Sequence, residues 1–228
     1  MNNRNLVIFL TVSVIAVLLI FSIARSFSRK NAIKEENVQG ELKEYNGEKL
    51  SSVLAFRENS IIGPQKVDIK SYKLEIVNTS GNSKSYKFNE IIEKFKPIKK
   101  VVKLYCVEGW DVKVLFEGIL VKELLQEVGV SDNDKIVILH SVDGYTTSLP
   151  VSYFLENDIL LGYKINGITL PEQLGFPFQL VAEEKWGYKW ARWVNKIELS
   201  SDVDYKGFWE SRSYSNSGDL DKPFFGED

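Results

Sequence analysis

The sequence is poor in the residues that most often bind metals or form disulfides. Its 228 residues include one cysteine, Cys106, and one histidine, His140. A single cysteine excludes an intrachain disulfide and any zinc or iron–sulfur site built from several cysteines. A single histidine likewise excludes a metal site with several histidine ligands. A metal bound by this chain must therefore use carboxylates or arrive as part of a cofactor.

The sequence also lacks an excess of basic residues. It has 29 Lys and Arg against 31 Asp and Glu, which gives a formal net charge of -2. Nucleic-acid binding relies on clustered positive charge that neutralises phosphates. The composition therefore gives no reason to expect a nucleic-acid partner.

The one long run without charge lies near the N-terminus. Residues 5–24 contain no charged side chain, and the segment LVIFLTVSVIAVLLIFSIA is mainly apolar. As a helix this segment would span about 28 Å, close to the hydrocarbon thickness of a bilayer. The basic segment RSFSRK follows directly, whereas a cleaved signal peptide has a shorter apolar core and a small-residue cleavage site. We therefore expect one uncleaved transmembrane helix, residues 1–25, and a single-pass membrane protein.

Composition divides the rest of the chain. Residues 26–52 are rich in charge and nearly free of aromatic residues, which predicts a linker. Residues 53–216 have the usual size of one globular domain, and residues 217–228 would form a C-terminal tail. Basic residues flank the apolar run on both sides, so the positive-inside rule leans only slightly towards a cytoplasmic domain. The side of the membrane stays open.

Hydrophobic periodicity after residue 53 predicts many strands and few short helices, which is typical of an α+β fold. The hairpin at 159–170 has Asn166-Gly167 as its turn, and the first helix has Asn89 as a cap. The expected strands are 66–78 (a strand pair, with a turn at 78–85), 99–106, 113–119, 135–141, 159–170, 178–184 and 190–200, and the expected helices are 88–95, 120–129 and 149–157.

Cys106 lies at the exit of the strand predicted over residues 99–106, in the stretch KLYCVEGW. A free cysteine is most often a small buried hydrophobe. A side chain at the end of a strand, before a glycine-containing loop, is also well placed for function. The neighbouring Glu108 would raise the pKa of the thiol, which argues against a simple nucleophile but not against a metal ligand. Taken alone, Cys106 fits either interpretation.

Two further stretches combine polar and aromatic residues. EEKWGYKWARW, residues 183–193, places Lys189 and Arg192 among aromatic side chains and beside Gly187, which suits an oxyanion and a flat heterocycle. The same sequence would also fit an edge strand whose aromatic side chains fill the core while its lysines lie in solvent. HSVDGYTTSLP, residues 140–150, offers hydroxyl groups for polar ligand edges, or forms an ordinary hydrogen-bonded turn. No nucleophile elbow accompanies His140, so a hydrolase triad is rejected.

Together, the stretches resemble the sulfite oxidase family of molybdopterin-dependent oxidoreductases, which includes the catalytic subunit of bacterial methionine-sulfoxide reductases. The resemblance implies an α+β fold, with a sulfite-oxidase-type molybdopterin-binding arrangement of mixed sheets and short helices, preceded here by one transmembrane helix. The matching stretches keep the family order between about residues 55 and 215: RENSIIGPQ, YCVEGW, FEGILVKELL, HSVDGYTTSLP, ILLGYKINGITLP, GFPFQLV, WGYKWARWVNKIEL and DYKGFWESRSYS.

The resemblance implies a molybdenum cofactor and a set of residues that bind it. The Cys106 thiolate would be the only protein ligand of the metal, and molybdopterin would supply the others together with oxo or hydroxo groups. Arg57 and Arg192 are candidates for binding an anionic substrate near the metal. The positions that match the cofactor-binding motifs are Asn59, Cys106, Thr147, Gly187, Lys189 and Arg192.

Three positions depart from the family pattern. Leu174 stands where His or Asn is usual, Gln179 where Arg is usual, and Trp190 where a small residue is usual. Losing a charge-assisted contact to phosphate costs about 1.5–3 kcal/mol. Either the cofactor is held by a changed set of contacts, which the presence of Cys106 favours, or the fold has lost it.

The expected function is two-electron oxygen-atom transfer on a small sulfite- or sulfoxide-like molecule by a membrane-anchored enzyme. The dimerisation domain of true sulfite oxidases does not follow in the sequence, so the reductase catalytic subunit is the closer relative. Such subunits receive electrons from a membrane haem protein, which we expect as a partner. Related proteins are exported by a twin-arginine signal that is not found here. The alternative is a non-catalytic anchored domain that has lost the cofactor and binds a partner.

Overall fold

The computed structural model describes residues 38–226 of the chain. The transmembrane helix predicted over residues 1–25 therefore lies outside the described residues. Within residues 38–226, no helix has the length and apolar character needed to cross a membrane. From Gly40 onward the described chain belongs to one compact unit. This unit takes in residues 40–52 of the expected linker and residues 217–226 of the expected tail.

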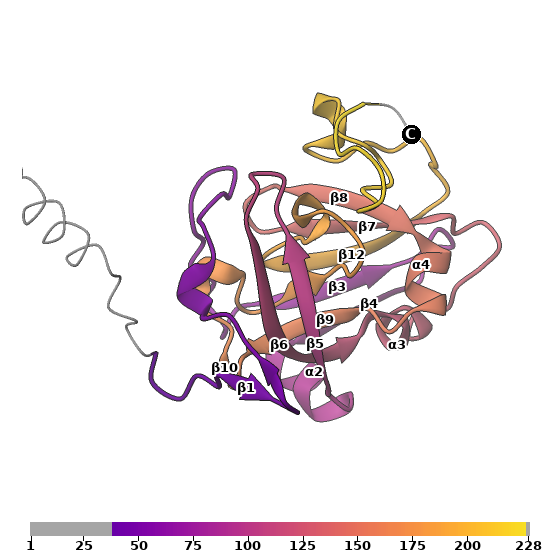
Figure 1. Ribbon diagram of the computed structural model, residues 1–228. Helices are drawn as coiled ribbons and strands as arrows, with labels where there is room; N and C mark the ends of the chain where they lie inside the picture. Colours follow the sequence, from indigo (N-terminus) through magenta and orange to yellow (C-terminus); the bar gives the residue numbers. More distant parts are fainter. Residues whose placement is uncertain (1–37, 227–228) are drawn as a thin grey trace, which may run out of the picture. The chain divides into compact units, whose positions relative to one another are not determined.

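Within the described residues, one antiparallel sheet, one mixed sheet and a small hairpin carry the fold (Figure 1). One sheet has the order β10-β9-β6-β5, with β11 also pairing β9, and the other has the order β4-β3-β12-β7-β8. The pair β3–β12 is parallel, whereas its neighbours β3–β4 and β12–β7 are antiparallel. The strands are β1 (Glu44–Tyr45), β2 (Glu48–Lys49), β3 (Lys73–Val77), β4 (Ser83–Lys87), β5 (Ile98–Tyr105), β6 (Asp111–Leu120), β7 (Ile136–Ser141), β8 (Thr146–Pro150), β9 (Leu160–Ile165), β10 (Ile168–Thr169), β11 (Gln179–Val181) and β12 (Val194–Ser200).

Three short α-helices connect these strands: α2 (Phe88–Lys94), α3 (Val121–Gln126) and α4 (Val151–Glu156). Each begins directly after a strand and buries part of its apolar side chains, and the predicted start of the last helix after Pro150 is confirmed. Antiparallel and mixed sheets with few short helices confirm the predicted α+β class.

The strand that leads to the cysteine is built by simple alternation. In β5, Val102 and Leu104 point into the core and are buried, while Lys99 and Lys103 are exposed. β5 pairs along its whole length with β6, from Ile98 opposite Gly118 to Tyr105 opposite Asp111. The end of β5 is therefore rigid, and Cys106 follows it directly.

The predicted hairpin at residues 159–170 is confirmed as β9 and β10. Asn166 and Gly167 form its turn, and both have the positive φ angles that favour Asn and Gly there. The buried Asn166 side chain also accepts a hydrogen bond from Leu115 N at 2.9 Å and donates to Ser51 O at 2.9 Å and to Glu41 Oε1 at 3.0 Å. One turn residue thus ties the segment around residues 41–51 to the sheet.

Several predicted boundaries were wrong. Only Lys73–Val77 of the segment 66–78 is a strand, and its partner β4 begins within the stretch 78–85 that was expected to be a turn. The first helix begins at Phe88, where the Glu90 carboxylate accepts the Lys87 N–H at 2.8 Å, so Asn89 is not its cap. The hydroxyl residues after the 142–145 turn lie in β8 and not in a loop. Hydrophobic periodicity did not predict β4 and β8 because β4 is polar and the turn after β7 is short.

Candidate active site

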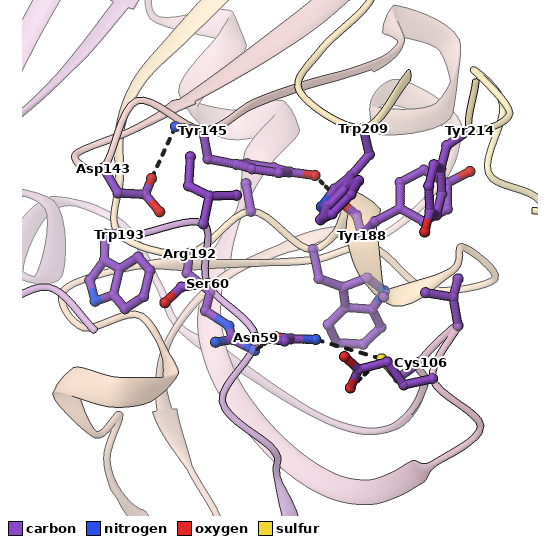
Figure 2. A pocket seen from close by; sticks show the side chains of 16 residues that line it. Asn59, Ser60, Cys106, Asp143, Tyr145, Tyr188, Arg192, Trp193, Trp209 and Tyr214 are labelled. Atoms are coloured by element: carbon purple, nitrogen blue, oxygen red, sulfur yellow. Dashed lines mark hydrogen bonds between the residues drawn. The ribbon is translucent and has the colours of Figure 1, made fainter. Parts of the chain in front are cut away.

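A pocket forms where loops from separate parts of the chain meet, and Figure 2 shows the side chains that line it. These loops are the segment before β3, the β5–β6 turn, the β7–β8 turn, the loop between β11 and β12, and the C-terminal segment. The lining residues are Asn59, Ser60, Ile61, Cys106, Val107, Glu108, Asp143, Tyr145, Gly187, Tyr188, Trp190, Ala191, Arg192, Trp193, Trp209 and Tyr214.

Cys106 is fixed in the pocket by a tight turn between β5 and β6. Its N–H donates to Trp110 O at 2.9 Å, and Gly109 N–H donates back to Cys106 O at 3.0 Å. Gly109 has a φ of 81°, a conformation that glycine adopts without strain. The Cys106 residue is 6% exposed, so its sulfur is presented to the pocket and not to bulk solvent.

An amide links the Cys106 sulfur to a guanidinium (Figure 2). Asn59 Nδ2 donates to Cys106 Sγ at 3.6 Å, and Arg192 Nη2 donates to Asn59 Oδ1 at 2.7 Å. The Cys106 thiol also lies 3.9 Å from Glu108 Oε2, which accepts the Trp110 indole N–H at 2.9 Å. The sulfur therefore has both an amide donor and a carboxylate close to it.

Burial raises the pKa of the Cys106 thiol above its ordinary value. The negative charge of Glu108 raises it further, while the Glu108 backbone N–H, Arg192 and Asn59 act in the opposite direction. A thiol with a raised pKa is a poor free nucleophile at neutral pH. Coordination to a metal cation deprotonates a thiol outright, so this environment suits a metal ligand better than a nucleophile.

The pocket residues fit an anionic, metal-bearing pterin cofactor. Arg192 Nη1 is buried with no hydrogen-bond partner, and the Glu58 carboxylate lies 3.5 Å from it. Burial lowers the Arg192 pKa, which means that its charge is poorly solvated and would gain from an anion. At Gly187 a Cβ would lie 3.2 Å from Tyr105 O and 3.5 Å from Cys106 Cα, so glycine keeps this wall close to the cysteine.

The described residues contain no group of three or more His, Cys, Asp or Glu side chains that could hold a metal ion. A metal at Cys106 must then bring its other ligands with it. A dithiolene cofactor supplies sulfur ligands of this kind, and soft thiolates suit such a centre.

The structure brings together four of the predicted site residues, namely Asn59, Cys106, Gly187 and Arg192. The other three lie outside the pocket lining. Lys189 and Thr147 are fully buried in the interior behind the pocket, and Arg57 is exposed. The role of each residue stays a prediction.

The three departures from the family pattern fall in two places. Trp190 lines the pocket, is 3% exposed, and donates its indole N–H to Lys185 O at 3.1 Å. Leu174 and Gln179 are buried and do not line the pocket, and the Gln179 Oε1 atom has no hydrogen-bond partner. The bulky Trp190 thus forms part of the wall itself, whereas the other two substitutions are buried outside the pocket lining.

Sequence reasoning did not assign Asp143, Trp209 or Tyr214 to the site. Asp143 lies in the β7–β8 turn, where its Oδ1 accepts the Tyr145 N–H at 3.0 Å, and burial raises its pKa. Trp209 and Tyr214 lie in the stretch DYKGFWESRSYS. The one sequence signal for them was that the family resemblance extends over this stretch.

A profile of the family described as "Oxidoreductase molybdopterin binding domain" matches residues 62–209. An uncharacterized oxidoreductase, YuiH of Bacillus subtilis, is 28% identical over 157 residues, which cover 68% of this chain and 78% of that protein. The putative protein-methionine-sulfoxide reductase subunit YedZ1 of Azospira oryzae is 26% identical over 151 residues, which cover 66% of this chain and 57% of that protein.

The fold is also similar to a solved structure. The sulfane dehydrogenase SoxCD from Paracoccus pantotrophus matches with a TM-score of 0.58 and 19% sequence identity, over 63% of this chain and 42% of that chain. The chain therefore spans less than half of that protein and a little over half of YedZ1.

The family match covers well over half of the chain, so this protein belongs to the oxidoreductase molybdopterin-binding domain family. It is an oxidoreductase whose cofactor is molybdopterin. The resemblance to sulfite oxidases and methionine-sulfoxide reductases predicted from YCVEGW and its companion stretches is confirmed.

Proposed function

We propose that this protein is a membrane-anchored molybdenum enzyme that transfers one oxygen atom and two electrons, acting on a small neutral sulfoxide-like substrate. The observation that carries the proposal is the position of the Cys106 sulfur, which lies inside a pocket and is linked through Asn59 to the buried Arg192 guanidinium. The pocket offers one thiolate for a metal and one unsatisfied guanidinium N–H group for an anion.

Four residues would hold the cofactor. Cys106 would bind the metal, Asn59 would orient its thiolate and stabilise it by a hydrogen bond, Arg192 would bind an anionic group, and Gly187 would allow close approach of the backbone. The bound cofactor supplies a metal that accepts or donates an oxygen atom and two electrons. The protein's part is to fix the thiolate, exclude water and position the substrate.

The charges in the pocket support a neutral substrate. Two carboxylates, Glu108 and Asp143, line it together with one guanidinium, Arg192, which already donates to Asn59. Sulfite is an anion, and Arg192 would be the one basic side chain of the pocket lining able to bind it, because Arg57 is exposed and outside that lining. Aromatic side chains make up much of the wall and suit the apolar groups of a thioether or sulfoxide.

One of these carboxyl groups, that of Asp143, can hold a proton that the reaction consumes. Reduction of a sulfoxide to a thioether consumes two electrons and two protons and releases the oxygen as water. Burial raises the pKa of Asp143, which favours its protonated form at a higher pH than usual for this residue. Asp143 is therefore our candidate for holding a proton in the pocket.

Electrons would come from a membrane-bound carrier. The uncharged run at residues 5–24 supports an N-terminal anchor, followed by a charged linker and the catalytic domain. An anchored domain meets a membrane carrier at a raised effective concentration, without needing a large interface. The printed name of YedZ1 describes a reductase subunit, which supports a multi-component system. A membrane haem protein is the carrier that we propose.

The experiment uses full-length protein purified from a molybdenum-replete host. Molybdenum and pterin content per chain are measured first, because a non-catalytic domain that has lost the cofactor would contain neither. Turnover is then measured with a reduced artificial donor and either a dialkyl sulfoxide or an amine oxide as acceptor, and separately with sulfite and an oxidised acceptor. We expect one molybdenum per chain and faster turnover with the neutral acceptors. Faster turnover with sulfite would contradict the proposed substrate class.

A further inference from the structure

The last part of the described chain forms one wall of the site. We call residues 205–226 the C-terminal strap. Two of its side chains, Trp209 and Tyr214, line the pocket opposite Cys106 (Figure 2), and the strap appears in yellow in Figure 1 beyond β7 and β8. The strap is long and has little regular structure, with one short 3-10 helix at Glu210–Arg212. Something other than secondary structure must therefore hold it in place.

The strap crosses the loop that carries Gly187 and Arg192. Trp186 N–H donates to Gly218 O at 2.8 Å, and Tyr188 OH donates to Ser215 O at 2.8 Å. Gly218 lies directly on the Lys189 side chain, since a Cβ there would be 2.7 Å from Lys189 Cγ. The strap backbone at Gly218 is thus packed against the Lys189 side chain of the loop.

An ion pair joins the two segments inside the protein. Lys189 Nζ lies 2.6 Å from Glu210 Oε1, and both side chains are 0% exposed. Thr147 Oγ1 donates to the same Glu210 oxygen at 2.5 Å, and Lys189 Nζ also donates to Ser148 O at 3.0 Å. The pair therefore fastens the strap to both the cofactor loop and β8.

We propose that Lys189 and Glu210 are positioning residues that latch the C-terminal strap over the cofactor site, so that Glu210 controls how firmly the cofactor is retained. Glu210 immediately follows Trp209 in the pocket wall, and Lys189 lies between Gly187 and Arg192 in sequence. Lys189, expected from sequence to hold the cofactor, thus acts on it through the strap. The inference rests on the family's cofactor and not on the substrate proposed above.

Replacing Glu210 would remove the carboxylate that faces the buried Lys189 ammonium group, and the loss of one member of a buried ion pair is strongly unfavourable. The strap has little regular structure, so it can relieve this cost by opening locally while the sheets stay folded. Opening would expose the cofactor on the side of Trp209 and Tyr214. A substitution that breaks the ion pair should therefore both open the strap and speed the loss of the cofactor.

The test compares full-length, cofactor-loaded wild type with Glu210→Gln. The matched control is Glu93→Gln, the same exchange at an exposed position of α2. Hydrogen–deuterium exchange is measured in peptides from the strap and in peptides from β5 and β6. The molybdenum and pterin retained after prolonged gel filtration are measured in parallel. Exchange is also followed in protein made without cofactor, so that strap opening is read independently of cofactor binding and turnover.

We expect Glu210→Gln to raise exchange in the strap at least tenfold, to leave β5 and β6 protected, and to shorten cofactor retention several-fold, with Glu93→Gln like wild type. Unchanged strap exchange would overturn the proposal, as would an open strap with normal retention. An equal rise in β5 and β6 would show a general loss of stability and would also overturn it.

A second variant covers the case in which Glu210→Gln does not fold. Gly218→Ala keeps both charged residues of the ion pair but forces a Cβ against the Lys189 side chain, at a residue with a φ of 63°. It should open the strap and weaken cofactor retention in the same way. Normal strap protection and retention in Gly218→Ala would contradict the latch. Because no substrate is used in any of these measurements, their failure would leave the proposed oxygen-atom transfer untouched.

Discussion

At the scale of single residues, the site is organised around one sulfur atom and the groups that touch it. Asn59 holds the Cys106 sulfur and the Arg192 guanidinium at once, because its amide has a donor at one atom and an acceptor at the other. A side chain without both functions cannot make the link. Hydrogen bonds from outside the ligand set commonly tune a metal and orient its ligands.

We predict that Asn59→Leu, which is similar in size but apolar, lowers turnover about 10–100-fold, in the range usual for such supporting contacts. The reason is that both the thiolate and Arg192 lose a partner. Turnover and molybdenum content of the variant are measured together. Asn157→Leu is the control, since Asn157 is exposed and makes one hydrogen bond, to Tyr153 O. Wild-type turnover in Asn59→Leu would show that the amide link has no role.

The raised pKa of the Cys106 thiol gives a prediction for protein without cofactor. Burial favours the uncharged thiol, so the reactive thiolate forms only at a pH above that needed by an ordinary cysteine. The rate of alkylation should therefore rise with a midpoint above that of free cysteine. Glu108→Gln should lower this midpoint, because the Glu108 charge raises the pKa of the thiol. Rates are measured by mass spectrometry against pH, and a midpoint below that of free cysteine would contradict this account.

At the scale of elements, the fold was predictable where the sequence pattern is strong. The strand before Cys106 and the Asn166-Gly167 hairpin carry clear signals and are both present. The strand β4 was missed because its sequence, SKSYK, lies at a sheet edge with mostly exposed side chains, so apolar residues do not alternate there. Pattern reasoning finds strands that bury one face, and β4 buries little.

The site could be predicted only in part, for a related reason. A cysteine and an arginine suit the binding of a metal and of an anion by their chemistry alone, so Cys106 and Arg192 could be proposed without knowing the fold. The role of Lys189 could not be read from type alone, because its partner Glu210 is 21 residues away and the pairing depends on how the strap crosses the loop. Long-range pairing of buried charges leaves no local signal in a single sequence.

The β9–β10 turn supports a prediction on stability. Asn166→Ala removes three buried side-chain hydrogen bonds, to Leu115, Ser51 and Glu41, and should lower the free energy of unfolding by about 2–4 kcal/mol. Denaturant unfolding measures this change. Asn157→Ala, at an exposed position with one hydrogen bond, should change it by under about 1 kcal/mol. Equal effects of the two substitutions would mean that Asn166 does not tie residues 41–51 to the sheet.

At the scale of the whole molecule, the chain joins an apolar N-terminal run to a compact domain that carries the complete pocket. All the pocket residues lie between Asn59 and Tyr214, within the unit that begins at Gly40. The chemistry should therefore not require the N-terminal segment. Its proposed part is to keep the domain near a membrane electron carrier.

We predict that a chain beginning at Gly40 keeps its molybdenum and its turnover with a soluble artificial donor, but no longer sediments with membranes. Fractionation and metal analysis check both points. The full-length chain is the control in the same host. Continued membrane association of the shortened chain would contradict the anchor, and loss of the metal would contradict an independent catalytic domain.

The most direct test of the account is X-ray absorption at the molybdenum edge, because the central claim is a bond between the metal and the Cys106 sulfur. We predict that wild-type protein shows one more sulfur neighbour than Cys106→Ser, and that the variant loses turnover while its sheets stay folded. An equal number of sulfur neighbours in the two proteins, or full turnover of Cys106→Ser, would contradict the claim.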